Sequence, residues 1–347
     1  MSRPTKPTRS KRPSMNDVAK RAGVSQTTVS FVVNQVSEAN IPPETQERVW
    51  AAVKELGYRP NAIARGLRSN KTHTIGFITD HIATTPYAVR ILEGAQDIAW
   101  ANGYLLLLVN TSGDQRLKQT AIDMMMDRQV DGIIYATMYH RPVSPPAAMK
   151  ELPAVLLDCY SPDRDFPSVV PDEVLGGRTA VETLLKKGHR RIGFAQDSSP
   201  IPAVFGRLKG LKQALAAYDL PFQEELVRSK LSAQGGGYEA TMQLMGLPEP
   251  PTAIFCFNDR MAMSAYNALR DLKLSIPDDV AIIGFDNQDL IAADLSPPLT
   301  TMALPHYKMG QWAVEHLLGL IEDPDQINPD QPIQHLMPCP LIERQSV

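Results

Sequence analysis

Apolar residues recur with helical spacing over the first sixty residues of the chain. Three such sets are separated by Gly23-Val24 and by Pro42-Pro43. Their inward positions are Val18, Ala19 and Ala22, then Val29, Val32 and Val33, then Val49, Ala52, Val53 and Leu56. The pattern predicts three short helices: the first capped by Ser14 or Asn16, the second capped by Ser25, and the third over residues 44–56.

The second predicted helix is polar on the side away from its valines. Short hydrogen-bonding side chains stand there, those of Gln26, Thr27, Thr28 and Ser30. Two short helices joined by a tight turn with glycine, and closed by a third helix, are typical of a helix-turn-helix DNA-binding head. A plain three-helix bundle with a solvated polar face is the alternative.

The rest of the chain alternates short apolar runs with amphipathic segments. The expected strands are 75–79, 104–109, 132–136 and 154–158, followed by 191–195, 226–229, 253–257 and 280–285. The expected helices are 88–101, 116–128, 176–187, 207–218, 238–244 and 260–272, with one more over 308–321. Strands that alternate with helices predict parallel sheets, and two such series predict two similar α/β lobes.

Short polar side chains stand where several predicted strands end. They are Asp80, Asp158, Asn258 and Asp286. Ligands of open α/β sheets lie at the carboxyl ends of the strands, so these side chains are expected in a cleft between the lobes. Their oxygens suit the hydroxyl groups of a sugar or another polyol. The alternative for each residue is a cap or turn before the next helix.

The net charge of the 347 residues is −3, which by itself does not point to nucleic acid. The charge is unevenly divided, however. Residues 1–72 carry 13 Lys and Arg against 5 Asp and Glu, a net charge of +8, while residues 73–347 carry 22 against 33, a net charge of −11. A small basic end on a large acidic body predicts a polyanion-binding module attached to a domain with another role.

The composition also excludes several classes of protein. The longest apolar runs, such as residues 105–109, are far shorter than the ~20 residues that span a bilayer. No apolar leader is present and Cys159, Cys256 and Cys339 form no CxxC pair, which predicts a cytoplasmic protein with unpaired thiols. No phosphate-loop, metal-binding or hydrolase motif occurs, so we expect no cofactor, no metal ion and no catalytic residue.

The first sixty residues resemble the DNA-binding head of the lactose/galactose repressor (LacI/GalR) family. The resemblance lies in residues 14–30 (SMNDVAKRAGVSQTTVS), in Val32-Val33-Asn34 and in residues 55–62 (ELGYRPNA). It implies that the helix from Gln26 to Asn34 lies in the major groove of an operator. Base contacts are implied for Gln26 and Thr27, and other DNA contacts for Ser25, Thr28, Ser30, Asn34, Tyr58 and Asn61.

The head departs from the family pattern at two places. Phe31 stands where many relatives carry Arg or His, so a ring that can contact a thymine methyl replaces a hydrogen bond to guanine. The loop between Asn34 and Thr45 is longer than in those relatives. The operator is therefore expected to differ from theirs.

Residues 60–71 can form a helix but are too few to be helical alone in water. In the family the matching segment is a hinge helix that folds on the operator and inserts a Leu into the minor groove. The resemblance makes Leu67 the inserted residue, places Ala64 against the neighbouring hinge and lets Arg68 reach the DNA backbone or minor groove. A simple linker is the alternative.

The body is similar to the effector-binding core of the same family, which also looks like periplasmic sugar-binding proteins. The similar segments are 187–192 (KGHRRI), 206–211 (GRLKGL), 258–262 (NDRMA), 283–287 (IGFDN) and 297–301 (PPLTT). The effector contacts implied by the resemblance are Arg207, Asn258 and Asp286, with Tyr87 as an aromatic wall and Asp80 and Asp158 as weaker candidates.

The class of effector is predicted from one position. Purine-sensing relatives carry Trp where this chain carries Cys159, which favours a sugar over a stacked purine. His189 directly follows Gly188 at the predicted end of a helix, so a structural role is expected for it.

The expected domains are a flexible basic arm (1–13), a helix-turn-helix domain (14–60), a hinge (61–72) and an effector-binding and dimerisation core (73–347). Within the core, the N-lobe is expected over about 73–170 and 302–330, and the C-lobe over about 171–298 with the C-terminal segment returning to it. The fold class is thus α/β, with an all-α head and a periplasmic-binding-protein-like core of two parallel-sheet lobes.

The predicted function is sequence-specific transcriptional regulation by a repressor. The resemblance implies a homodimer rather than a tetramer, because the tetrameric relatives carry a leucine heptad after the core and none follows it here. It would bind a pseudo-palindromic, double-stranded operator in the nucleoid, under allosteric control by a sugar or glycoside. The alternatives are a nucleoside effector, a sugar-binding protein and an enzyme.

Overall fold

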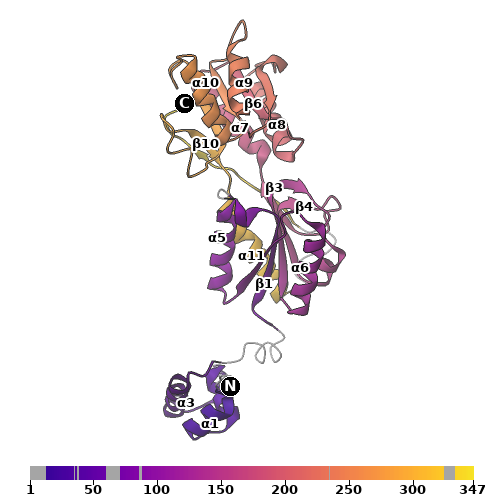
Figure 1. Ribbon diagram of the computed structural model, residues 1–347, viewed down its shortest axis with the longest axis vertical. Coiled ribbons are helices and arrows are strands. Elements are labelled where there is room, and N and C mark those ends of the chain that lie inside the picture. Colours follow the sequence, from indigo (N-terminus) through magenta and orange to yellow (C-terminus); the bar gives the residue numbers. More distant parts are fainter. Residues whose placement is uncertain are drawn as a thin grey trace, which may run out of the picture. The chain divides into compact units, whose positions relative to one another are not determined.

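The computed structural model describes residues 13–34, 36, 39–59, 71–85, 88–233, 235–323 and 333–347. The chain forms two compact units, residues 1–72 and residues 73–347 (Figure 1). The expected arm, up to residue 12, and the expected hinge, up to residue 70, lie outside the described residues.

The first unit contains three helices around a small core of valine and alanine side chains. They are α1 (Met15–Ala22), α2 (Gln26–Val33) and α3 (Pro43–Leu56). Ser14 caps α1 in a capping box with Asp17, and Gly23 ends this helix in the left-handed conformation (φ 67°). The helical head expected from the spacing is therefore confirmed, with Ser14 rather than Asn16 as the first cap.

The first lobe of the second unit is a parallel sheet with helices on both faces. Its strands are β1 (Thr74–Thr79), β2 (Leu105–Asn110), β3 (Gly132–Pro142), β4 (Ala154–Tyr160), β5 (Ser168–Pro171) and β11 (Gln334–Met337), in the order β11-β5-β4-β3-β1-β2. Helices α5 (Val89–Ala101) and α11 (His306–Glu322) cover one face, and α6 (Gln115–Asp127) covers the other (Figure 1). Short 3-10 helices lie at Ile82–Thr84 and Ala147–Glu151.

The second lobe repeats this architecture. Its strands are β6 (Ile192–Asp197), β7 (Val227–Lys230), β8 (Ala253–Cys256), β9 (Ala281–Asp286), β10 (Thr300–Ala303) and β12 (Leu341–Ile342), in the order β12-β10-β9-β8-β6-β7. All its pairings are parallel except that of β12 with β10. The helices are α7 (Glu173–Lys186), α8 (Pro202–Ala217), α9 (Gly236–Met245) and α10 (Asp259–Asp271), with a 3-10 turn at Glu224–Leu226. The expected two-lobed α/β core is confirmed.

The chain passes between the two lobes three times. It leaves the first lobe after β5 to begin α7, returns after β10 to form α11, and leaves again after β11 to reach β12. Both lobes are therefore built from segments far apart in the sequence, and their relative placement depends on three short connections.

Helices α5 and α11 cross in close contact on one face of the first lobe. At Gly310, an added Cβ would overlap the Ile91 carbonyl oxygen, and at Gly94 it would overlap the Tyr307 carbonyl oxygen. Each helix thus lacks a side chain where the other passes, which lets the two backbones approach.

Two features of the core differ from the sequence-based expectation. Strand β3 continues to Pro142 beyond a register shift between Ala136 and Arg141. The short strands β5, β10, β11 and β12 lie where the hydrophobic pattern predicts no strand. The first lobe resumes just after the expected position of about 302, since β10 pairs with β9 through Ala303.

Candidate DNA-binding head and effector site

Helix α2 is fixed at both ends by its own polar side chains. The Ser25 hydroxyl accepts a hydrogen bond from the Thr28 backbone N–H at 3.0 Å and bonds the Thr28 hydroxyl at 2.9 Å. At the other end the Asn34 amide donates to the Ser30 carbonyl oxygen at 2.8 Å and to the Ser30 hydroxyl at 3.2 Å. These side chains hold a rigid, solvent-facing helix whose opposite side buries Val29 and Val32.

The first turn of α2 presents Gln26 and Thr27 to solvent. Phe31, one turn further, is half-buried and lines a surface pocket together with Ile41 and Trp50. The exposed pair has the hydrogen-bonding groups that read base edges, whereas Phe31 offers only apolar contact.

The remaining predicted DNA contacts of the head divide into two groups. Tyr58 is buried in the core of the head, so its ring holds α3 in place and cannot reach base edges. Asn61, Ala64, Leu67 and Arg68 lie outside the described residues.

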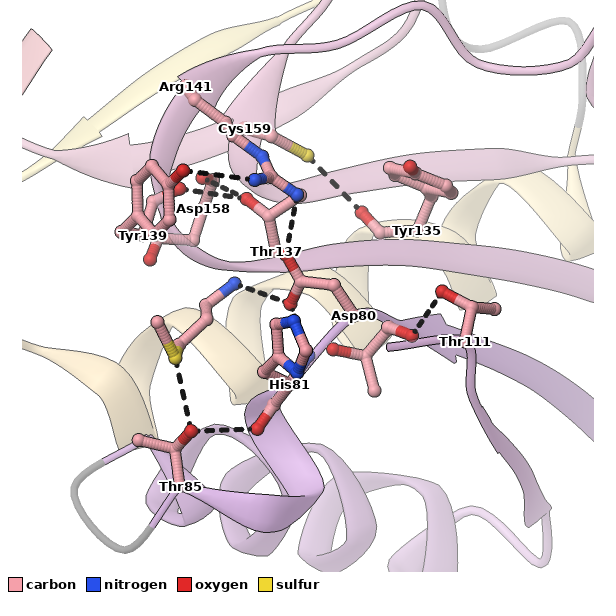
Figure 2. Close-up of polar contacts among 12 residues, drawn as sticks. Asp80, His81, Thr85, Thr111, Tyr135, Thr137, Tyr139, Arg141, Asp158 and Cys159 are labelled. Atoms are coloured by element: carbon pink, nitrogen blue, oxygen red, sulfur yellow. Dashed lines mark hydrogen bonds and ion pairs between the residues drawn. The ribbon is translucent and has the colours of Figure 1, made fainter. Parts of the chain in front are cut away.

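Asp80 stands at the end of β1, where it organises the edge of the first lobe. Its Oδ1 accepts from the Met138 backbone N–H at 3.0 Å, and its Oδ2 accepts from Arg141 Nη2 at 2.5 Å (Figure 2). Arg141 also lies over the Tyr139 ring, with 4.9 Å between Cζ and the ring centre. The carboxylate is 5% exposed, so this ion pair is largely shielded from water.

Asp158 lies near the end of β4 in the left-handed conformation (φ 55°). Thr137 donates to its backbone oxygen at 2.8 Å, but the side-chain Oδ1 has no hydrogen-bond partner among the described residues (Figure 2). Burial raises the pKa of the carboxyl well above its ordinary range, and the negative charges of Glu173 and Asp80 raise it further. The Asp158 carboxyl therefore feels charges from both lobes.

Arg207 is the central cation of the second lobe. Its Nε donates to Glu173 Oε2 at 2.7 Å, its Nη1 donates to the Phe257 carbonyl oxygen, and both ionic side chains are at most 5% exposed. The guanidinium lies over the Phe285 ring, 3.6 Å from its centre. Gly206 makes the pair possible, because a side chain there would overlap Glu173.

The last residue of β9, Asp286, adds an acidic group beside this cation. Asp286 Oδ1 is 3.8 Å from Arg207 Nη2, and burial raises the pKa of Asp286 to about 6 although Arg207 lowers it. Asn258 acts as the cap of α10, since its Oδ1 accepts from the Met261 backbone N–H at 2.9 Å. Of the two roles expected for Asn258, a ligand contact or a helix cap, the structure thus shows the helix cap.

The end of β3 brings His140 to the place where the lobes meet. Burial lowers the pKa of His140, while Glu173 raises it and Arg207 lowers it, so the imidazole feels two side chains of the other lobe. Its Nδ1 is buried and has no partner among the described residues. We name the set formed at this place the junction cluster: Asp80, His140, Arg141, Asp158, Glu173, Arg207 and Asp286.

Over about nine-tenths of its length the chain is similar to known transcriptional repressors. It is 35% identical over 315 residues to the ribose operon repressor of Escherichia coli strain K12, covering 89% of this chain and 93% of that protein. It is 34% identical over 319 residues to the HTH-type transcriptional repressor PurR of Aliivibrio fischeri strain MJ11, covering 90% of this chain and 92% of that protein. Residues 14–61 match the family described as bacterial regulatory proteins, lacI family. The chain belongs to this family.

The remaining comparisons agree with the lacI-family assignment. Residues 181–347 match a periplasmic binding protein-like domain. A solved structure of the Lac repressor dimer bound to operator and the anti-inducer ONPF is 28% identical, covers 97% of this chain and 99% of that chain, and has a TM-score of 0.78. This lacI-family protein is therefore a DNA-binding transcriptional regulator with a helix-turn-helix head and a ligand-binding core.

The structure brings together most of the predicted effector residues. Asp80, Asp158, Arg207 and Asp286 belong to the junction cluster, whereas Tyr87 lies outside the described residues. The preference for a sugar that was drawn from Cys159 stays a prediction. This side chain is fully buried on the α6 face of the sheet and donates to the Tyr135 carbonyl oxygen, so it does not face a ligand (Figure 2).

Three members of the junction cluster escaped the sequence reasoning: His140, Arg141 and Glu173. The first two follow the register shift in β3, and Glu173 lies in the first turn of α7, where an acidic residue is common for helix-dipole reasons alone. His189, by contrast, has the expected structural role, with Nδ1 2.9 Å from the Thr252 hydroxyl.

The described residues contain no group of three His, Cys, Asp or Glu side chains that could hold a metal ion. Within the same part of the chain, no helix is both long and apolar enough to cross a membrane.

Proposed function

We propose that this protein is a homodimeric repressor whose affinity for a pseudo-palindromic operator is controlled by a carbohydrate at the junction cluster. The observation that carries the proposal is the pair of buried, unpartnered polar atoms there, Asp158 Oδ1 and His140 Nδ1. Buried polar groups in folded proteins are almost always hydrogen-bonded. A ligand with several hydroxyl groups supplies both donors and acceptors for them.

The two relatives named above do not decide between a sugar and a nucleoside, since their identities to this chain are nearly equal. The junction itself favours hydrogen bonding over base stacking. The Arg207 guanidinium already lies over the rings of Phe257 and Phe285, at 4.4 and 3.6 Å from their centres. Both rings are also buried, so they offer a purine no exposed face to stack on, whereas a sugar needs none.

The head supports operator binding by two kinds of contact. In the proposed complex Gln26 and Thr27 read base edges, and Ser25, Thr28, Ser30 and Asn34 contact phosphates. The hinge, with Leu67 in the minor groove, completes the interface. We place this activity in the cytoplasm, on the nucleoid DNA.

A groove beside the edge strand β2 supports the homodimer. Leu107 and Val109 of β2 and Leu117 and Met124 of α6 line it, and Leu117 and Met124 are each about half exposed. Contiguous apolar surface of this kind marks an association face. A second copy of the chain, related by a two-fold axis, would cover the same groove on both partners and set two heads on two half-sites.

The test begins with a thermal-shift panel of sugars and nucleosides on the full-length protein. Any hit is then titrated into a complex with an operator obtained by in vitro selection, and fluorescence anisotropy measures the affinity for DNA. Coupling of ~1–3 kcal/mol is expected, and the operator must change the affinity for the hit by the same factor.

Two results would contradict the proposal. One is that nucleosides alone stabilise the protein and alter operator binding, which would exclude the carbohydrate. The other is that the hit is converted during incubation, as followed by NMR, since the proposed core binds its ligand without chemical change.

A further inference from the structure

Each arginine of the junction cluster is already held by a carboxylate of its own lobe. In the first lobe Arg141 Nη2 lies 2.5 Å from Asp80 Oδ2, and in the second lobe Arg207 Nε lies 2.7 Å from Glu173 Oε2. Asp286, 3.8 Å from Arg207 Nη2, is a second acidic neighbour of the same guanidinium. Neither arginine therefore has positive charge left to balance an anionic ligand.

Three other basic side chains lie in or near the cluster. Burial lowers the pKa of His140, which favours its neutral form. The Lys118 ammonium lies over the buried Tyr135 ring on the α6 face of the sheet, 5.2 Å from the ring centre, and burial and the charge of Arg141 lower its pKa. Arg260 faces Asp286 of the cluster, because its charge lowers the pKa of that carboxyl. Asp158, in turn, has an unpartnered oxygen that needs a hydrogen-bond donor.

We infer that the effector is an uncharged polyhydroxy compound, a free sugar or sugar alcohol, and that Glu173 and Asp80 are the specificity-determining residues that exclude its phosphorylated or carboxylated forms. The inference rests on the proposed carbohydrate site. An anionic group in the junction would meet Asp286 and two arginines that are each already paired with a carboxylate, and like charges brought together out of water are strongly unfavourable. A neutral ligand meets no such repulsion and gives its hydroxyl protons to the free acceptors.

The experiment compares neutral compounds with their phosphates on the full chain by isothermal titration calorimetry. The pairs are ribose and ribose 5-phosphate, glucose and glucose 6-phosphate, and inosine and inosine 5′-monophosphate. For any pair that binds, the phosphate is expected to bind at least about 100-fold more weakly than the neutral partner. Differential scanning calorimetry with inorganic phosphate alone tests the same exclusion without knowledge of the effector.

Three variants assign the exclusion to residues. Glu173→Gln keeps the size of the side chain but removes the negative charge that pairs with Arg207. The preference for the unphosphorylated compound of each pair should therefore fall at least about tenfold, and inorganic phosphate should now stabilise the protein. Asp80→Asn tests the same effect at Arg141, which is 30% exposed and tolerates the loss of its partner better. Glu182→Gln is the matched control, because Glu182 pairs with Arg178 on the same helix outside the cluster, at 2.6 Å.

The outcomes separate this inference from the function proposed above. A phosphate that binds the native protein as tightly as its neutral partner would overturn it. An equal response of the native protein, Glu173→Gln and Asp80→Asn to inorganic phosphate would also overturn it. If only inosine binds, and its monophosphate does not, the carbohydrate proposal fails while the exclusion of anions stands.

Discussion

The Asp259 side chain at the start of α10 is fully buried. It accepts hydrogen bonds from the Thr301 hydroxyl at 2.6 Å and the Gln288 backbone N–H at 2.7 Å, yet burial, and then the charge of Asp286, raise its pKa to about 8. An acid whose pKa is raised on folding binds its proton more tightly in the folded state. Its contribution to stability is complete below the ordinary value of 3.8 and is lost as the pH rises towards 8.

We therefore predict that the unfolding temperature of the core falls by about 5 °C between pH 5 and pH 8, and that Asp259→Asn reduces this fall. Part of the fall should remain, because burial also raises the pKa values of Asp158 and Asp286. Differential scanning calorimetry at the two pH values measures both. Asp294→Asn, at an exposed carboxylate, serves as the control and should keep the native pH dependence. A pH dependence unchanged in Asp259→Asn would show that another group is responsible.

Phe31 is the residue at which the head departs from its relatives, and it shares a surface pocket with Trp50 of α3. Phe31→Arg is predicted to move the selected operator towards G at the contacted base, by ~1–3 kcal/mol of discrimination, because Arg can bond two acceptors of guanine. Binding-site selection and sequencing detect the change. Trp50→Arg is the control: it adds the same charge from the neighbouring helix and should strengthen DNA binding without changing the selected base. Identical selected sites for Phe31→Arg and the native protein would refute the role of position 31 in base selection.

The residues that spacing alone identified act locally, whereas the ion-pair partners that the sequence did not indicate lie far away in the chain. Ser14, Ser25 and Gly23 stand within one turn of the helix ends that they cap, so spacing alone reveals them. Glu173 and Arg207 are 34 residues apart, and Asp80 and Arg141 are 61 apart. No local pattern indicates which distant acid a buried arginine will meet, so these pairs needed the folded structure.

At the scale of elements, the lengths of strands were harder to predict than their order. The apolar run that marks β3 ends at Ala136, but the strand continues through polar residues to Pro142 after a register shift. Hydrophobicity cannot reveal such an extension, because backbone pairing and not side-chain burial stabilises it. The extension matters for function, since it carries His140 and Arg141.

The crossing of α5 and α11 gives a prediction for one element. Gly310→Ala should destabilise the core by ~1–3 kcal/mol in urea unfolding, because the new methyl group overlaps the Ile91 carbonyl oxygen and the helices must separate. Gly319→Ala lies on the same helix with nothing within 4 Å of the added Cβ, and should stabilise by ~0.5–1 kcal/mol through helix propensity alone. Equal effects of the two variants would mean that the crossing does not require glycine.

For the whole molecule, the β2–α6 groove predicts how the subunits associate. Leu117→Glu should convert a dimer into a monomer in sedimentation velocity and weaken operator binding about 100-fold or more, since a single head then binds each half-site alone. Leu290→Glu, at a residue that is 78% exposed in the other lobe, is the control and should leave the dimer intact. A Leu117→Glu protein that still sediments as a dimer would place the interface elsewhere.

The uneven charge has a simple counterpart in the two units. The excess of +8 belongs to residues 1–72, which contain the DNA-binding head, and the excess of −11 belongs to the ligand-binding core. Operator binding should accordingly fall steeply with salt, while effector binding should depend on it little.

The three passages between the lobes also determine which lobe the head is joined to. An odd number of passages leaves β1, where the chain enters the core, and β12, its last strand, in opposite lobes. Only the first lobe is covalently continuous with the head, so within one chain every displacement of the second lobe reaches the head through three short connections. A fluorophore near residue 72 would thus label the first lobe, and another near β12 would label the second. Energy transfer between the two would follow lobe movement when the effector binds, with no label in the junction cluster.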